Sequence, residues 1–143
     1  MMVSTRGHYA LLVMIDLAEQ QTSRFIPLKD IAARQGISEK YLESIVKLLV
    51  QASFLEGLRG KGGGYRLLKA PENCNVGQIL RLTEETLAPV SCLDERAQPC
   101  QRAATCKTLP MWQKLHAMIN GYFDGITIAD LMDAGQGADN YVI

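Results

Sequence analysis

The stretch that decides the fold is LKDIAARQGISEKYLESIVKLLVQASFLEGLRGKGGGYRL, residues 28–67. Leu28 and Ile31 predict the inner face of a short helix, and Gly36 supplies the backbone freedom that a tight turn between two helices needs. Ser38 is placed to cap a second helix, because its hydroxyl can accept a backbone N–H of the first turn. This pattern is typical of a helix-turn-helix.

The second helix is expected to have two different faces. Its apolar residues recur at helical spacing and therefore face a core: Leu42, Ile45, Leu48 and Leu49. The opposite face presents polar side chains to solvent or to a ligand: Glu39, Lys40, Glu43, Ser44 and Lys47. In a helix-turn-helix, the second helix is the one that reaches base edges in the major groove.

A hairpin is expected directly after this helix. Residues 54–56 and 65–67 can pair as short strands across the basic, glycine-rich segment 59–64. These glycines lack the Gly-Lys-Ser/Thr ending of a phosphate loop, and they precede a strand rather than a helix. A helix-turn-helix alone could be no more than two packed helices. Because a basic wing follows it here, the combination predicts a protein that binds duplex DNA.

The predicted DNA-binding residues come from the second helix and from the tip of the wing. Glu43 is expected to accept a hydrogen bond from a cytosine amino group, and Arg59 to enter the minor groove. Lys40 and Lys47 are expected to meet phosphates. The full predicted set is Ser38, Glu39, Lys40, Tyr41, Glu43, Lys47, Arg59, Gly60 and Lys61.

Composition and charge agree with a small regulator. The 143 residues suffice for one domain with an extension. Without an apolar run near ~20 residues or an apolar N-terminal segment, the chain is expected to be cytoplasmic and without a membrane span. The formal net charge is zero, but residues 1–70 carry ten Lys/Arg and six Asp/Glu, whereas residues 71–143 carry five and nine. The basic half contains the predicted DNA-binding elements, as attraction to phosphate requires.

The order of elements predicts a mainly α fold with a small β-wing. We expect a winged helix-turn-helix domain over 1–70, a helix and cysteine-bearing sensor loop over 71–107, a dimerisation helix with a short terminal helix over 108–134, and a flexible tail over 135–143. Asn75 is placed to cap a helix over 76–85. Thr127 and Asp130 have the spacing of a capping box for the last helix.

The helix expected over 110–124 has an apolar stripe that little of the remaining chain can cover. Its members are Trp112, Leu115, Ile119, Tyr122 and Phe123. Either this helix folds back on the first helix, or it packs on a copy of itself about a two-fold axis. We favour the homodimer, because one helix-turn-helix reads few base pairs and a dimer matches a pseudo-palindromic operator.

Three of the four cysteines lie in the irregular connection before that helix, spaced Cys92-x7-Cys100-x5-Cys106 among polar neighbours. Such neighbours do not favour burial of the thiols, and disulfides are unexpected without an export signal. The spacing is not that of a zinc ribbon, so structural zinc is possible but not indicated. Soft thiolates from one flexible loop suit an iron–sulfur cluster, which needs a fourth donor. Thiol redox chemistry is the alternative.

Four stretches together resemble the Rrf2 family of bacterial winged-helix regulators: STRGHYAL (4–11), QGISEKYLE (35–43), RGKGGGYRL (59–67) and TLPMWQKL (108–115). The resemblance implies a homodimer whose long C-terminal helix crosses to the partner, with the recognition helix in the major groove and the wing in the adjacent minor groove. In the family's cluster-binding branch, three cysteines lie in the loop before the long helix. Cys92, Cys100 and Cys106 occupy that place, which implies a 2Fe–2S or 4Fe–4S cluster.

The chain departs from that branch in two ways. The usual spacing is Cys-x5-Cys-x5-Cys, so the loop here must bulge by two residues between Cys92 and Cys100. Some members also have a histidine three residues after the last cysteine, where this chain has Leu109. In another branch the fourth ligand comes from the start of the first helix of the other subunit. The matching residue is His8, which is either that ligand or a solvated residue facing phosphate or water.

Three functions are then open. The first is a DNA-binding transcription regulator that senses iron, redox state or nitric oxide through an iron–sulfur cluster. The second is a regulator of the same fold without a cluster, controlled by cysteine thiol oxidation, a metabolite or a partner enzyme of cysteine metabolism. The third, an enzyme or electron carrier, is disfavoured because no nucleophile–base or paired-carboxylate arrangement is visible. Cys74 is expected to be structural or to complete the ligand shell, and His116 to pack or to lie at the surface.

Overall fold

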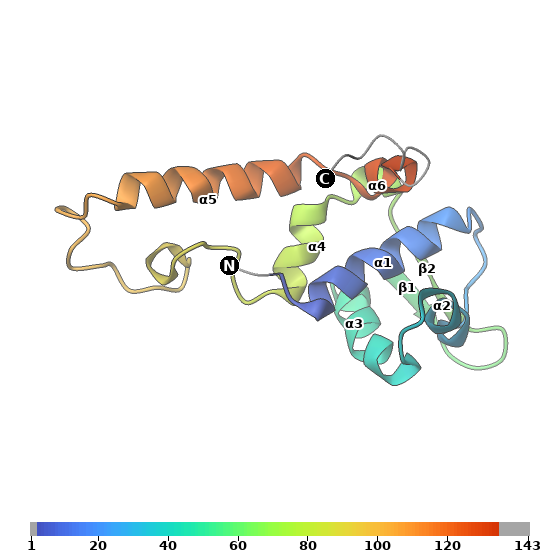
Figure 1. Ribbon diagram of the computed structural model, residues 1–143. Coiled ribbons are helices and arrows are strands. Elements are labelled where there is room, and N and C mark those ends of the chain that lie inside the picture. Colours follow the sequence, from blue (N-terminus) through green and yellow to red (C-terminus); the bar gives the residue numbers. More distant parts are fainter. Residues whose placement is uncertain (1–2, 135–143) are drawn as a thin grey trace.

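The computed structural model describes residues 3–134 (Figure 1). In chain order its elements are α1 (Thr5–Glu19), α2 (Leu28–Gln35), α3 (Glu39–Gln51), β1 (Leu55–Leu58), β2 (Gly64–Leu67), a 3₁₀ turn η1 (Pro71–Asn73), α4 (Val76–Thr83), a second turn η2 (Ser91–Leu93), α5 (Leu109–Asp124) and α6 (Ile128–Ala134). The fold is mainly α with a two-stranded wing, as predicted. The tail predicted over 135–143 lies outside the described residues. No described helix has both the length and the apolar character needed to cross a membrane.

Helix α1 is the centre of the fold, because α2, α3, α4, α6 and β2 all pack against it (Figure 1). Its inner face contributes Val13 and Met14 to the core, and α3 contributes Ile45 and Leu49; all four side chains are fully buried. Burial of each such side chain stabilises the fold by about 1.5–3 kcal/mol. The core therefore fixes α3 by its apolar face and leaves the polar face outward.

The helix-turn-helix forms as predicted. Leu28 and Ile31 on α2 are buried. Gly36 ends α2 with φ +65°, a left-handed conformation that glycine adopts at little cost. The Ser38 hydroxyl caps α3 by accepting the backbone N–H of Tyr41 at 3.1 Å. These local features place the start of α3 at the surface.

An ion pair between a buried carboxylate on α1 and a partly exposed arginine on α2 joins the two helices. The Asp16 side chain is only 2% exposed and accepts hydrogen bonds from Arg34 Nη2 at 2.8 Å and Arg34 Nε at 3.0 Å. Gln35 Nε2 donates to the same carboxylate at 2.8 Å. The hydrogen bond with Asp16 raises the pKa of the Arg34 guanidinium above its ordinary value. Loss of Arg34 would leave the buried Asp16 carboxylate without its cation, so this contact stabilises the packing of α2 on α1.

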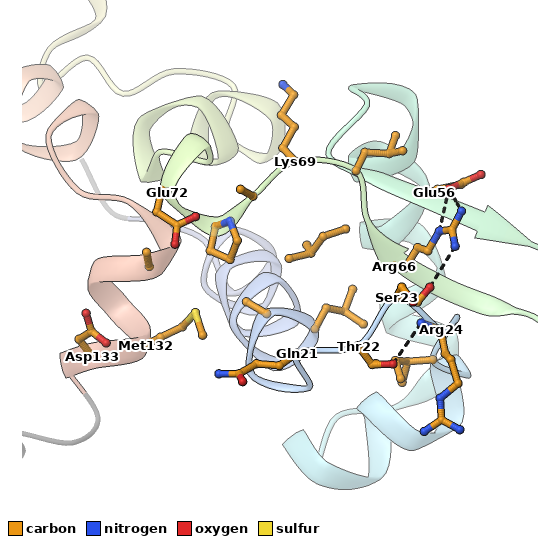
Figure 2. A pocket seen from close by; sticks show the side chains of 18 residues that line it. Gln21, Thr22, Ser23, Arg24, Glu56, Arg66, Lys69, Glu72, Met132 and Asp133 are labelled. Carbon is orange, nitrogen blue, oxygen red and sulfur yellow. Dashed lines mark hydrogen bonds and ion pairs between the residues drawn. The ribbon is translucent and has the colours of Figure 1, made fainter.

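The wing is a two-stranded antiparallel hairpin, as predicted, and it is tied to the α1–α2 loop that precedes the helix-turn-helix. The register pairs Leu55 with Leu67, Glu56 with Arg66, Gly57 with Tyr65 and Leu58 with Gly64. Arg66 Nη2 lies 2.8 Å from Glu56 Oε2, and Arg66 Nη1 donates to the Ser23 carbonyl at 3.0 Å, beside a hollow of about 730 Å³ (Figure 2). Ile26 exchanges two backbone hydrogen bonds with Tyr65, at 2.8 and 2.9 Å. The α1–α2 loop therefore orients the wing.

The predicted helix caps in the C-terminal half are confirmed. The Asn75 side chain accepts the backbone N–H of Gln78 at 2.8 Å and begins α4. Thr127 and Asp130 exchange side-chain to backbone hydrogen bonds at 2.9 and 3.1 Å and begin α6. Helix α4 ends at Thr83 rather than at residue 85, because Glu84 takes an extended conformation.

Helix α5 projects from the body of the fold, and α4 packs against its C-terminal part (Figure 1). Arg81 of α4 donates to Asp124 and Asn120 at 2.8 Å each, and Phe123 packs against the small cluster around Leu80. Helix α5 therefore packs on α4 and does not fold back along α1, which was the alternative.

The predicted stripe on α5 turns out to combine two faces of the helix. One face holds residues that are partly buried, Trp112, Ile119 and Phe123, and α4 packs against its C-terminal part. The other face is exposed over the length of the helix: Met111, Leu115, Met118 and Tyr122, at 54, 37, 61 and 68%. Met111 and Met118 were absent from the predicted stripe. The spacing of apolar residues in α5 does not distinguish its partly buried face from its exposed face.

Candidate nucleic-acid interface and cysteine loop

The predicted DNA-binding residues lie on the polar face of α3 and at the tip of the wing, and three of them, Glu43, Lys47 and Arg59, line one cleft between these elements. All of them are solvent-exposed: Ser38, Glu39, Lys40, Tyr41, Glu43, Lys47, Arg59, Gly60 and Lys61. The buried face of α3 anchors the helix, so the polar face is presented on a rigid element. Such an element can hold side chains at fixed positions against base edges.

Tyr41 at the start of α3 is oriented by α1. Its ring meets the ring of Tyr9 edge-on, with centroids 5.6 Å apart and an interplanar angle of 90°. Edge-to-face pairs of this kind contribute about 0.5–1.5 kcal/mol beyond the area that they bury. A shift of the α1 N-terminal turns would therefore move Tyr41 and the start of the recognition helix.

A cleft of about 450 Å³ separates α3 from the wing. Glu43, Lys47 and Gln51 line it from α3, four residues apart on one face of the helix, and the wing contributes Arg59 and Tyr65. Sequence reasoning missed Gln51 and Tyr65. The four-residue spacing after Glu43 and Lys47 was the signal that could have found Gln51.

The cations of this region are free to meet phosphates. In residues 3–134, ion pairs join Arg34 to Asp16, Arg66 to Glu56, Arg81 to Asp124 and Arg96 to Asp94. None of these pairs includes Lys40, Lys47, Arg59 or Lys61. Exposed cations without acidic partners produce the positive potential that steers a protein to DNA.

The cysteine loop, residues 84–108, contains no regular structure beyond the short η2 turn. Cys92 and Cys100 are exposed, Cys106 is half-buried, and all three thiols are free. In the part of the chain that the structure describes, no three His, Cys, Asp or Glu side chains lie close enough to hold a metal ion. The three thiols thus fit an iron–sulfur cluster in donor chemistry and access, but the single chain does not bring them together.

Cys106 and Cys74 are in contrasting environments. The Thr108 hydroxyl lies 3.4 Å from Cys106 Sγ, and its hydrogen bond, with those of the Thr108 and Leu109 backbone N–H groups, lowers the pKa of the Cys106 thiol. Cys74 is fully buried in the main core, and this burial raises the pKa of its thiol. Cys106 is therefore more readily ionised than an ordinary thiol, which favours a ligand or redox role, whereas Cys74 packs as a small apolar group.

The two histidines also differ in their surroundings. His8 is exposed in the first turns of α1, with its ring centroid 5.9 Å from that of Tyr9. His116 is half-buried on α5, and Asn120 donates to its backbone carbonyl at 2.9 Å. His8 is accessible to a second molecule, and His116 belongs to the packing between α4 and α5.

The beginning of the cysteine loop is tied to the start of α1. Glu84 Oε1 accepts hydrogen bonds from the Ser4 backbone N–H at 2.9 Å and the Ser4 hydroxyl at 2.8 Å. Further along the loop, Arg96 donates to the Glu85 carbonyl at 2.8 Å. The loop is thus joined to the same helix that carries His8 and Tyr9.

Comparisons with known proteins agree with this arrangement. A family model described as "Rrf2: Iron-dependent Transcriptional regulator" matches residues 3–134. The HTH-type transcriptional regulator IscR of Aliivibrio salmonicida is 35% identical over 132 residues, 92% of this chain and 77% of the relative. The structure of T. potens IscR is similar with a TM-score of 0.75 and 33% identity, over 100% of this chain and 94% of that one. CymR, the global cysteine regulator of B. subtilis, gives a TM-score of 0.74 and 32% identity, over 93% and 97%. These relatives are named regulators, not enzymes, and the chain belongs to the Rrf2 family of transcriptional regulators.

Proposed function

We propose that this regulator binds duplex DNA as a homodimer and that an iron–sulfur cluster controls its affinity for a pseudo-palindromic operator. The observation that carries DNA binding is the cleft between α3 and the wing, which Glu43, Lys47 and Arg59 line together. Within the described chain, Lys47, Arg59 and the exposed Lys40 of α3 have no acidic partner. The cations supply attraction to the backbone, and the helix supplies base contacts.

The exposed face of α5 supports the homodimer. Met111, Leu115, Met118 and Tyr122 recur along one exposed face of the helix, whereas α4 packs against the C-terminal part of another face. A second copy of α5 would cover the exposed face about a two-fold axis. Met118→Glu places a charge in the middle of it and should give a monomer in sedimentation equilibrium. Ala117→Glu, an exposed position on another side of α5, serves as the control and should remain dimeric. A dimeric Met118→Glu variant would place the interface elsewhere.

For the cluster, we propose Cys92, Cys100 and Cys106 as ligands, with His8 of the partner subunit as the fourth. The support is chemical: three accessible free thiols on one loop, with the pKa of Cys106 lowered by the Thr108 hydroxyl and neighbouring N–H groups. Thiolates and imidazole are ligands that iron–sulfur clusters use. When bound, such a cluster supplies sensitivity to iron supply, oxidants and nitric oxide. The surrounding chain supplies the loop, whose residues 95–105 are exposed throughout and are therefore little constrained by packing.

The contacts of Glu84 suggest how a change in the loop reaches the DNA. Glu84, the first residue of the loop, accepts hydrogen bonds from Ser4, which caps α1. Tyr9 on α1 packs edge-on against Tyr41 of α3. A loop rearrangement that displaces Glu84 would therefore shift α1 and the recognition helix together. The loop also leads into α5, so it can change the separation of the two recognition helices in a dimer. In this proposal α1 takes two positions that the loop and the DNA each favour differently, which is the requirement for allostery.

A thiol switch without a cluster is the second candidate. The lowered pKa of Cys106 favours a thiol switch, because thiolates react with oxidants more readily than thiols do. One of the similar solved structures, CymR, is named the global cysteine regulator of B. subtilis. Iron content of the protein purified without oxygen separates the two candidates, since only the first contains iron and sulfide.

DNA binding is tested by selection from random duplexes with the wild-type protein, in the metal-free form and after anaerobic loading with iron and sulfide. We expect at least one form to enrich a consensus with two-fold symmetry. Its half-sites should lie about one helical turn, roughly 34–36 Å, or a multiple of that apart. If neither form enriches any sequence or retards duplex DNA in a gel, the proposed function is wrong.

A further inference from the structure

We infer that the cleft between α3 and the wing holds the sugar–phosphate backbone that separates the two grooves, and that Gln51 positions the protein on that backbone. This inference rests on the proposed DNA binding. Gln51 is the last residue of α3 and is exposed, and no hydrogen bond within the described chain uses its side-chain amide. It lines the cleft together with Lys47 and Arg59.

The position of the cleft follows from the two elements that border it. If α3 lies in the major groove and the wing tip in the neighbouring minor groove, one backbone strand must pass between them. The space between them is the cleft of about 450 Å³, bounded by Lys47 and Gln51 on one side and by Arg59 on the other. The strand therefore passes these side chains. Contacts of this kind fix the register of a protein on the duplex.

The charges along α3 assign different roles to the two ends of the cleft. Glu43, Lys47 and Gln51 follow one another at four-residue intervals, so each lies about 6 Å further along the helix axis than the last. A carboxylate repels phosphate, so Glu43 belongs at the end near the bases. Lys47 offers an ammonium and Gln51 can turn its amide NH₂ toward the strand, and both groups can donate to phosphate oxygens.

Tyr65 and Gly57 shape the opposite wall. They are paired across the wing strands, and the Tyr65 ring lies so close to Gly57 that a Cβ there would be 3.1 Å from the ring carbon Cε1. The absence of a side chain at Gly57 lets the aromatic ring cover the strand at the cleft. Tyr65 therefore acts as a structural wall of the cleft in this inference.

The test changes the charge at position 51 and reads both affinity and salt dependence. Gln51→Lys and Gln51→Glu are compared with Gln78→Lys and Gln78→Glu, at an exposed glutamine on α4 outside the cleft. Binding is measured by fluorescence anisotropy on the duplex selected by the wild type and on an unselected duplex. Both glutamines are exposed, so the variants should fold, and circular dichroism confirms this.

We expect Gln51→Lys to bind both duplexes about 3- to 10-fold more tightly and Gln51→Glu to bind them more weakly by a similar factor, the scale of one hydrogen bond or close charge contact. The slope of log K against log salt should steepen by ~0.9 for Gln51→Lys, because one more phosphate is neutralised. The selected consensus should not change, since backbone contacts carry no sequence information. The Gln78 pair should resemble the wild type.

Two results would overturn the inference while leaving DNA binding intact. In the first, the Gln51 variants behave like the Gln78 variants in affinity and salt slope. In the second, the Gln51 variants change the selected consensus, which would make Gln51 a base-reading residue. If the wild type binds no duplex, the proposed function fails, and the inference fails with it.

Discussion

Ser4 and Glu84 are joined by two hydrogen bonds across eighty positions of sequence: the Ser4 N–H and hydroxyl both donate to Glu84 Oε1, at 2.9 and 2.8 Å. Ser4 also caps α1 by accepting the Gly7 N–H at 3.1 Å. Glu84→Ala should reduce the free energy of unfolding by about 1–3 kcal/mol, the scale for hydrogen bonds to a charged group. It should also shrink the difference in DNA affinity between the cluster-loaded and metal-free forms.

Glu85→Ala is the matched control for this coupling, because the Glu85 side chain is exposed and only its carbonyl is used, by Arg96. The measurements are urea unfolding and anisotropy titrations of both forms. A Glu84→Ala protein whose two forms differ in affinity as much as those of the wild type would show that the Ser4–Glu84 contact plays no part in signalling.

The wing tip is expected to contribute directly to affinity. Arg59→Ala should weaken operator binding by about 1–3 kcal/mol, because the guanidinium loses its place in the negative potential of the minor groove. A gel-shift titration at fixed salt measures the effect, with Lys114→Ala, an exposed cation on α5, as the control. If the Arg59 variant and the wild type bind the operator with equal affinity, the wing tip does not contact DNA through Arg59.

Glu43 is expected to set sequence preference more than affinity. Phosphate repels a carboxylate. We therefore expect the exposed Glu43 side chain to accept a hydrogen bond from a cytosine amino group. Glu43→Ala should relax the consensus at one base pair of each half-site while binding persists. Selection from random duplexes with both proteins checks this, and identical consensus sequences would reduce Glu43 to a solvated surface residue.

The cysteines of the metal-free, reduced protein should differ in reactivity with pH. The pKa of Cys106 is lowered by hydrogen bonds from the Thr108 hydroxyl and from backbone N–H groups, so its thiolate forms at lower pH than that of an ordinary thiol. Iodoacetamide should therefore modify Cys106 with a half-maximal rate below the ordinary thiol pKa, and Thr108→Val should shift that pH upward. Cys74 should resist modification until the protein unfolds, because it is buried. Peptide mass spectrometry resolves the sites, and identical pH profiles for wild-type and Thr108→Val protein would deny Thr108 this role.

Local features of the fold were predictable from the sequence because they depend on neighbouring residues. Ser38 and Asn75 as caps, Gly36 at the turn, and the pairing of strands around the glycine-rich tip all follow from rules that act over a few positions. The exposed face of α3 also followed from its period, since every third or fourth residue is apolar.

Relationships between distant segments were not predictable in the same way. The Ser4–Glu84 and Tyr9–Tyr41 contacts join residues whose local sequence carries no sign of a partner. The covered face of α5 depends on where α4 lies, which the period of α5 does not specify. For the cysteine loop, spacing indicated donor chemistry, but the positions of the thiols depend on a loop without regular structure.

The cysteine ligands can be tested one at a time. Ala in place of Cys92, Cys100 or Cys106 should remove the visible absorption of anaerobically reconstituted protein and leave a folded dimer, while Cys74→Ala should retain the absorption. His8→Ala should make the cluster more oxygen-labile without necessarily eliminating it. A cluster that survives unchanged in any of the three variants would remove that cysteine from the ligand set.

The most direct test of the account is anaerobic reconstitution of the wild-type protein with iron and sulfide, followed by iron and sulfide analysis, absorption spectroscopy and DNA titration of the loaded and metal-free forms. We predict a coloured protein that contains both iron and sulfide, and two forms that differ in affinity for the selected duplex. A colourless protein without bound iron would contradict the cluster, and the thiol switch centred on Cys106 would take its place.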